Sequence, residues 1–157
     1  MNYYYYYLEG QSKRNNIIID GIPESQRESW EETENKVRRT LAEKLEMDEG
    51  RIEVERAHRT GDPTTAGDRH RPIIVKFLRW KDKVAVMARA NKLRGTNIYL
   101  NEDYSEVVRL KRKELIPIMK AERSKGNIAY IRYNRLIVHP PSQRTVGGER
   151  SAKNTGS

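Results

Sequence analysis

Between residues 14 and 103, the hydrophobic positions follow strand and helix periods in turn. Short β-branched or alternating runs predict strands at residues 16–20, 52–57, 73–78 and 98–100. Apolar residues at helical spacing predict helices at residues 30–45 and 84–93. The predicted order is β-α-β-β-α-β, the ferredoxin-like arrangement of an α+β fold that RNA-recognition domains share. Right-handed crossovers would place both helices on one face of the sheet and leave the other face open for binding.

A second, smaller domain made of a helix and a β-hairpin is predicted at residues 104–141. The apolar stripe predicts a helix over residues 104–125, which ends before a glycine. Pro117 lies well inside this helix, so we expect it to kink the helix or to split it in two. Apolar runs at residues 129–133 and 136–138 flank a turn and predict the hairpin.

The two ends of the chain have the composition of disordered segments. Residues 1–13 are a low-complexity, tyrosine-rich stretch, and residues 142–157 are rich in Ser, Thr and Gly. The expected organisation is a disordered 1–13, an RNA-recognition-type domain at 14–103, a helix-hairpin domain at 104–141 and a disordered tail. We expect the helix-hairpin domain to be truncated, since it stops at Pro140 and Pro141.

The charge of the chain points to a polyanionic partner. The formal net charge is +9, and it is uneven: residues 1–50 carry 7 basic and 11 acidic side chains, whereas residues 51–99 carry 12 and 5. Lys and Arg placed near phosphates release condensed counterions, which favours nucleic-acid binding. The chain has no cysteine, which excludes disulfides and thiolate zinc sites, and it has no apolar run of membrane-spanning length. A soluble basic surface without a specific partner is the alternative reading of the charge.

The predicted sheet is poorly equipped to stack bases. RNA-recognition domains stack bases on aromatic side chains of the central strands, but here Ile18, Pro72 and Ile74 occupy those positions. Tyr99 is the one aromatic residue whose alternation could place it on the open face. It could equally be an edge-strand tyrosine with a solvated hydroxyl.

Basic residues are therefore the main candidates for nucleic-acid contact. The predicted binding residues are Arg59, Arg69, Arg71, Lys76, Arg79, Arg89, Lys92, Arg94, Tyr99, Arg109, Lys111, Arg112, Lys113, Arg132, Tyr133 and Arg135. Cations at the end of the second helix also favour its dipole, and a run of charge on a helix is often only a solvated face. We expect single-stranded RNA, and DNA as well, to bind across both predicted domains.

The sequence offers little for catalysis, and we expect no enzyme activity, no cofactor and no metal site. The three histidines lack metal-ligand spacing, and no glycine-rich phosphate loop or nucleophile elbow is present. A small acyl-phosphate hydrolase shares the βαββαβ outline and is the remote alternative. It would need anion-binding glycines after the first strand, where residues 21–24 supply a proline and an acid instead.

Several motifs occur together in a fixed order. They are NNIII at 15–19, GIPE at 21–24, ERAHRTG at 55–61, RPIIVKF at 71–77, KDK at 81–83, NEDYS at 101–105 and RYNRL at 132–136. As a set they resemble the first-open-reading-frame protein of LINE-type (non-LTR) retrotransposons, over about residues 14–139.

The resemblance implies a function in a retrotransposon ribonucleoprotein particle. It implies sequence-tolerant binding of single-stranded RNA and DNA, packaging of the element's RNA, and nucleic-acid chaperone activity during transposition. The family's RNA contacts would fall on Arg59, Arg71 and the region of Arg89 and Arg94. Its C-terminal motif would fall on Tyr133, Arg135 and Leu136.

Self-association and location also follow from the resemblance. The family forms trimers through an upstream coiled coil, which is missing from this chain. The expected location is a cytoplasmic ribonucleoprotein with access to the nucleus. The alternative function is a protein-interaction module derived from a retroelement, whose partner would bind the apolar positions of the open sheet face.

Overall fold

The chain forms two compact units, Met1–Ser105 and Glu106–Ser157, and each is described by itself. The computed structural model describes residues 3–48, 50–64, 67 and 69–141. The predicted tail at 142–157 lies outside the described residues. The helices of the described part are too short or too polar to cross a membrane.

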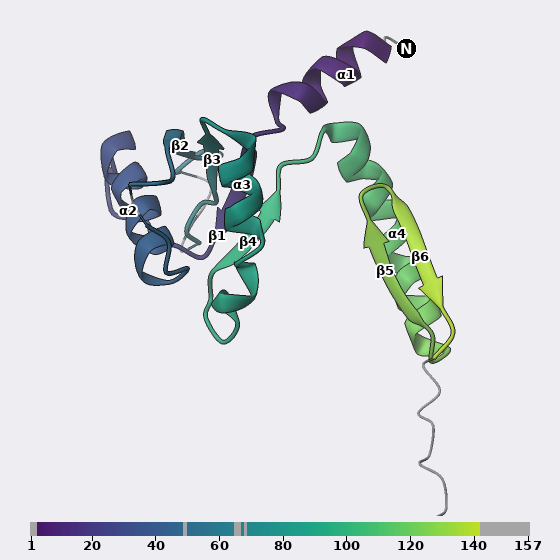
Figure 1. Ribbon diagram of the computed structural model, residues 1–157. Helices are drawn as coiled ribbons and strands as arrows, with labels where there is room; N and C mark the ends of the chain where they lie inside the picture. The colour runs from purple at the N-terminus through teal and green to yellow at the C-terminus, as the bar shows by residue number, and fades with distance from the viewer. Residues whose placement is uncertain (1–2, 49, 65–66, 68, 142–157) are drawn as a thin grey trace, which may run out of the picture. The chain divides into compact units, whose positions relative to one another are not determined.

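The first unit is a four-stranded antiparallel sheet with helices (Figure 1). Its elements are α1 (Tyr3–Ser12), β1 (Asn16–Asp20), α2 (Trp30–Glu43), β2 (Val54–Arg59), β3 (Ile73–Phe77), α3 (Trp80–Met87), the short 3-10 helix η1 (Ala90–Leu93) and β4 (Tyr99–Glu102). The strands lie in the order β2-β3-β1-β4, and each neighbouring pair is antiparallel. The predicted α+β class is confirmed.

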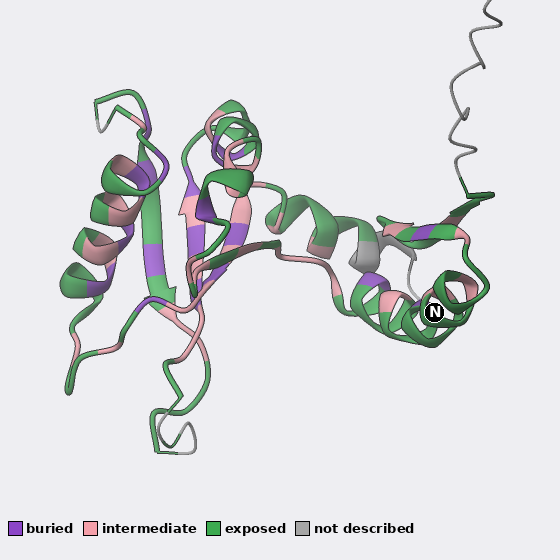
Figure 2. Cartoon of the chain, turned by 90° about the horizontal axis from the view of Figure 1, so that it is seen from below, coloured by how far each residue is buried: buried purple, intermediate pink, exposed green. Residues whose placement is uncertain are grey.

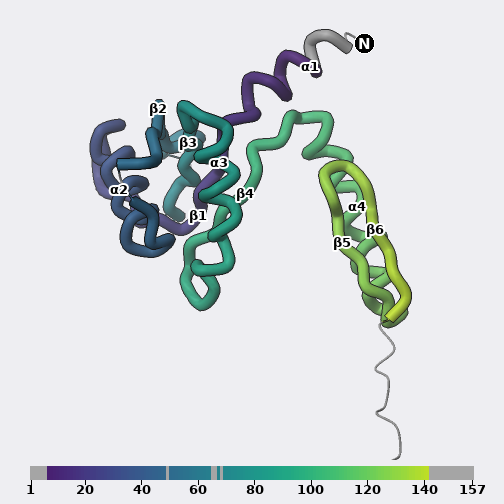
Figure 3. Tube along the Cα trace, in the orientation of Figure 1, coloured from purple at the N-terminus to yellow at the C-terminus, as the bar shows by residue number. Residues whose placement is uncertain are grey.

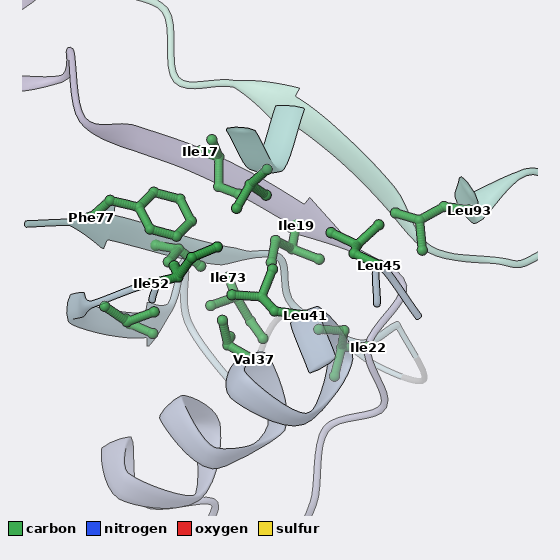
Figure 4. Close-up of a cluster of buried hydrophobic side chains, with 14 residues drawn as sticks. Ile17, Ile19, Ile22, Val37, Leu41, Leu45, Ile52, Ile73, Phe77 and Leu93 are labelled. Atoms are coloured by element: carbon green, nitrogen blue, oxygen red, sulfur yellow. The ribbon is translucent and has the colours of Figure 1, made fainter. Parts of the chain in front are cut away.

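One hydrophobic core joins the sheet to α2 and α3. Alternate positions of β1 and β3, such as Ile17 and Val75, are fully buried, while their neighbours are only partly buried (Figure 2). Val37 and Leu41 of α2 pack on this face with Phe77 (Figure 4). Because α2 and α3 contribute to the same buried cluster, both cover the same face and the opposite face is left open.

Local signals place α2 where the sequence indicates it. The Ser29 side chain caps the helix by accepting a hydrogen bond from the backbone N–H of Glu32 at 3.2 Å. Glu31 and Glu32 lie in the first turn, where acidic side chains favour the helix dipole.

The second unit consists of α4 (Glu106–Ser124) and a hairpin of β5 (Ile128–Arg132) and β6 (Arg135–His139). Both strands contact α4, and their traces run beside it (Figure 3). Val108 and Leu115 of α4 and Ala129 of β5 are buried. The Arg123 side chain ties the helix to the hairpin by donating to the carbonyl of Ala129 at 2.8 Å.

Two features of the structure correct the sequence expectations. Residues expected to be disordered form α1, which an i,i+4 ion pair between Glu9 and Lys13 supports at 3.3 Å. Of the two outcomes expected at Pro117, the split is wrong, because α4 runs through this residue without interruption. Both Pro117 and Lys113, whose carbonyl loses its helical partner to the proline, are exposed, so water can satisfy that carbonyl.

The ends of several elements also differ from the expected ones. The second strand begins and ends two residues later than expected, and β4 extends to Glu102. The region expected to be one helix at 84–93 divides into α3 and η1.

Candidate nucleic-acid interface

Arg59, expected to contact RNA, is buried as a structural residue. Its side chain is 4% exposed, and its Nε donates to Glu28 at 2.9 Å. Its two terminal nitrogens donate to the backbone carbonyls of Ile22, Pro23 and Arg71 at 2.7–2.8 Å. A further contact to Glu28 at 3.4 Å uses the fifth N–H group. Arg59 therefore holds the loop after β1 against the ends of β2 and β3, with little surface left for a phosphate.

Arg71 is similarly engaged with an acidic partner. Its guanidinium forms an ion pair with Glu24 and also donates to the carbonyl of Gly61 at 2.8 Å. The hydrogen bond from Arg71 lowers the pKa of Glu24 below its ordinary value, and the same contact raises the pKa of Arg71. This pair joins the loop after β1 to the loop between β2 and β3, so a phosphate would have to compete with a carboxylate.

The open face of the four-stranded sheet carries two kinds of surface. Cross-strand register places Tyr99 directly opposite Asp20, on the open face that its alternation indicated. Tyr99 is 61% exposed, but the neighbouring Asp20 carboxylate accepts a hydrogen bond from Asn101 and makes that edge acidic. Ile18 and Ile74 lie opposite each other at the centre and are only partly buried.

The other edge of this face is basic. Arg56 of β2 lies directly opposite Lys76 of β3. Lys76 has a distant partner in Glu55 at 3.8 Å, whereas no ion pair is found for the exposed Arg56 among the described residues. Like charges placed directly opposite in a ladder are destabilising. A phosphate at this edge would relieve that repulsion.

Cations after α3 serve mainly to hold the fold. Arg89 donates to the carbonyls of Leu45 and Glu46 at 3.0 and 2.9 Å, which satisfies acceptors after α2. Lys92 forms an ion pair with Glu46 at 2.6 Å. Arg94 is exposed, and the described part of the chain gives it no carboxylate partner.

Two further predicted residues lie at the surface of the first unit. Arg79 is close to Glu53 at 3.5 Å and to Asp82 at 3.9 Å, distances at which the pairing is weak. Arg69 is exposed and lines an open hollow of about 500 Å³ together with Arg27.

The second unit presents the clearest concentration of cations. Arg132 and Arg135 are directly opposite each other at the last pair of the β5–β6 ladder. Both are exposed, and neither forms an ion pair with any residue that the structure describes. The hairpin therefore carries two adjacent positive charges that nothing in its described surroundings neutralises.

The turn between these two arginines has a strained backbone. Tyr133 has a φ of 55°, a conformation that bulky residues rarely adopt, and its side chain is 58% exposed. Its carbonyl accepts a hydrogen bond from Arg112 of α4 at 2.8 Å. Arg112 thus fixes the turn to α4, and the strained turn holds the Tyr133 side chain in solvent.

Helix α4 adds a separate basic stripe. Arg109, Lys113 and Lys120 recur at spacings of four and seven residues and share one exposed side of the helix. Lys111 lies on another side, where it approaches Glu114 at 3.8 Å. Of the four cations predicted on this helix, Arg109 and Lys113 are thus the ones best placed to bind an anion.

Some residues of the basic surfaces were not among those predicted. Tyr130 and His139 fall on the same hairpin face as Arg132 and Arg135 once the strands are aligned, and Lys120 lies on the same side of α4 as Arg109 and Lys113. Strand alternation could have indicated Tyr130, two positions before Arg132. His139 could not be found in this way, because its contact with Tyr130 depends on the pairing register of the hairpin.

The remaining polar groups considered for catalysis are the histidines and carboxylates of the described residues. Within that part of the chain, no group of three His, Asp or Glu side chains is placed to hold a metal ion. The backbone N–H of Glu24 donates to Nδ1 of His70 at 2.9 Å, and the Glu24 carboxylate accepts from Nε of Arg71 at 2.9 Å. An anion bound after β1, as an acyl-phosphate hydrolase needs, would meet that carboxylate.

Comparison with known proteins assigns no family. No protein-family model matches the chain, and no curated protein matches it either.

Proposed function

We propose that this protein binds single-stranded RNA and DNA with little sequence preference and has no enzyme activity. The observation that carries this proposal is the pair formed by Arg132 and Arg135, two exposed arginines directly opposite each other in a ladder. Such a pair destabilises the free hairpin by a few tenths of a kcal/mol to about 1 kcal/mol. A phosphate between the two guanidinium groups would turn this repulsion into two charge-assisted hydrogen bonds.

The first unit fits a ferredoxin-like, RNA-recognition-type domain. Its elements after α1 follow the order β-α-β-β-α-β, and its sheet has the order β2-β3-β1-β4. In this proposal Arg56 and Lys76 bind phosphates at one edge of the open face, while Tyr99 is a weaker base contact beside the Asp20 carboxylate.

The helix-hairpin unit acts as a second nucleic-acid-binding domain in this proposal. Its described cations include Arg109, Lys113, Arg132 and Arg135, all exposed. Two basic units on one chain gain affinity for the same strand, because binding by one raises the effective concentration of the other.

The ordered set of motifs supports a more specific role. The resemblance to LINE-type first-open-reading-frame proteins suggests that the bound RNA is retrotransposon RNA in a ribonucleoprotein particle. Nucleic-acid chaperone activity, self-association through an upstream coiled coil and a cytoplasmic location belong to the same proposal.

Binding of labelled strands to the whole chain tests the proposal. Single-stranded RNA and single-stranded DNA should bind with similar affinity, and a blunt duplex should bind more weakly. Unlabelled poly-glutamate, an anion without bases, should displace the RNA poorly. Absence of RNA binding, or displacement by poly-glutamate as efficient as by RNA, would refute the proposal.

A protein-interaction module remains the second candidate function. Ile18 and Ile74 form a small apolar spot at the centre of the open sheet face, flanked in the ladder by His58 and Asn101. Substitution of Ile18 by Ser should abolish partner capture in this case and leave RNA affinity unchanged. Retained capture by Ile18→Ser would argue against a partner on this face.

A further inference from the structure

One face of the β5–β6 hairpin carries aromatic and basic side chains together. Directly opposite residues of a ladder share a face, so this outer hairpin face consists of Ile128, Tyr130, Arg132, Arg135, Ile137 and His139. Ala129, on the opposite face of the hairpin, is buried, whereas Tyr130 of the outer hairpin face is 40% exposed. The outer hairpin face is thus turned away from the small core of this unit.

Two rings on this face lie close to each other. The ring centroids of Tyr130 and His139 are 6.1 Å apart, with an interplanar angle of 41°. The two residues lie on different strands at diagonal positions of the ladder, so the hairpin itself holds them in place. Both side chains remain open to solvent.

The aromatic pair lies next to the arginine pair. Same-face residues of one strand are two residues apart, about 7 Å along it, so Tyr130 is one row from Arg132. The outer hairpin face has no carboxylate, since its six members are two isoleucines, two arginines, a tyrosine and a histidine. Its chemistry therefore suits a ligand with planar apolar groups linked by anions.

We propose that the Tyr130–His139 pair is a stacking subsite for an unpaired nucleobase. The phosphates that flank this base would contact Arg132 and Arg135 in the next row. This inference rests on the proposed single-strand binding and adds where the main stacking contact lies: on the hairpin, and not at the centre of the four-stranded sheet, where Ile18 and Ile74 lie. Because a paired base cannot lie flat on these rings, the subsite selects single strands over duplexes.

The test separates stacking from phosphate contact in the whole chain. The probes are a labelled single-stranded RNA and a strand of equal length with abasic sites, which keeps the phosphates and lacks the bases. Tyr130→Leu keeps apolar bulk without the ring, and Tyr130→Phe is the matched control that keeps the ring.

Stacking predicts a specific pattern of affinities. The unsubstituted chain should bind the RNA at least about tenfold more tightly than the abasic strand, and Tyr130→Leu should reduce that preference by about fivefold or more. Tyr130→Phe should bind both strands like the unsubstituted chain. The slope of log K against log salt should stay unchanged in both variants, because neither removes a charge.

Other outcomes would overturn the inference. Equal affinity of the unsubstituted chain for the two strands, with a steep salt dependence, would exclude the subsite and leave the proposed function standing. Absence of binding to either strand would reject both. Should Tyr130→Leu unfold the hairpin, His139→Leu provides a second variant, and an unchanged preference for the base-containing strand would count against the subsite. Capture of a protein by this face that RNA cannot displace would also contradict it.

Discussion

Nε of Arg59 donates a hydrogen bond to Oε2 of Glu28 at 2.9 Å, and both side chains are almost fully buried, with exposed fractions of 4% and 1%. Lys36 binds the other carboxylate oxygen at 2.8 Å. This three-residue cluster joins the loop before α2 to the end of β2. Removal of Arg59 leaves the buried Glu28 carboxylate with only one of its two cations, which is more costly than loss of a surface ion pair.

Arg59→Ala should destabilise the first unit by up to roughly 3–5 kcal/mol, because it leaves the buried Glu28 carboxylate with Lys36 alone and removes the donor to three backbone carbonyls. Trp30 and Trp80 both belong to this unit, so denaturant unfolding followed by tryptophan fluorescence reports its stability. Arg56→Ala is the matched control on the same strand, with an exposed guanidinium. It should leave stability nearly unchanged and weaken RNA binding. A stable Arg59→Ala protein with weakened RNA binding would contradict the structural role of Arg59.

The same cluster should make the first unit sensitive to acid. Burial raises the pKa of Glu28, but the hydrogen bonds from Arg59 and Lys36 outweigh it and hold the pKa below the ordinary value of 4.5. The unfolded chain thus takes up this proton more readily. The stabilisation from Glu28 is complete above about pH 4.5 and is lost as the pH falls through the lower folded-state pKa. Glu28→Gln should be less stable at pH 7 and should lose less of its stability between about pH 5 and pH 3. If both proteins lost equal stability over this pH range, the acid sensitivity would come from other carboxylates, such as Glu24.

Arg135→Ala should have opposite effects on stability and on binding. Loss of one charge relieves the repulsion with Arg132, so the free hairpin should be unchanged or more stable by up to about 1 kcal/mol. Affinity for RNA should fall for all sequences alike, because a phosphate contact reads no base. Hydrogen exchange of the β5 and β6 amides measures the first effect, and strand titration measures the second. A destabilised hairpin would show that this arginine has a structural partner.

Tyr133→Asn tests the strained turn. Asn adopts positive φ more readily than Tyr, so the turn should become more stable by up to about 1 kcal/mol. If the exposed ring stacks on a base, affinity for single-stranded RNA should fall by about 1–3 kcal/mol. Hydrogen exchange at the turn and RNA titration check the two effects. Unchanged affinity would remove Tyr133 from the interface.

Much of the fold of the first unit was readable from the sequence. The buried positions Ile17, Ile19, Ile73 and Val75 alternate along β1 and β3 as strands covered on one face require. The ends of the elements were less accurate, because contacts distant in the sequence decide them. Helix α1 was missed entirely: it ends where Lys13 reaches Asp103 and the Tyr104 carbonyl, a contact that local pattern does not encode.

The candidate site was only partly readable, and for a different reason. Arg59 and Arg132 look alike in sequence, since both are basic residues at the end of a strand. The first is surrounded by Glu28 and three carbonyl groups, whereas the second faces another arginine. Sequence identifies cations, but the partners contributed by other segments decide which cations remain available to a ligand.

The dependence of RNA affinity on salt tests the central claim most directly. The whole chain is titrated with an unstructured RNA at several salt concentrations, beside the double variant Arg132→Ala/Arg135→Ala and the control Arg51→Ala/Lys125→Ala. The control removes two exposed cations that already have carboxylate partners. Log K should fall linearly with log salt. Each phosphate contact of a single strand contributes roughly 0.7 to the slope, so the slope of the double variant, which loses two contacts, should be about 1.4 less steep. The slope of the control should equal that of the unsubstituted chain. A flat salt dependence of the unsubstituted chain, or equal slopes for all three proteins, would contradict the proposed interface.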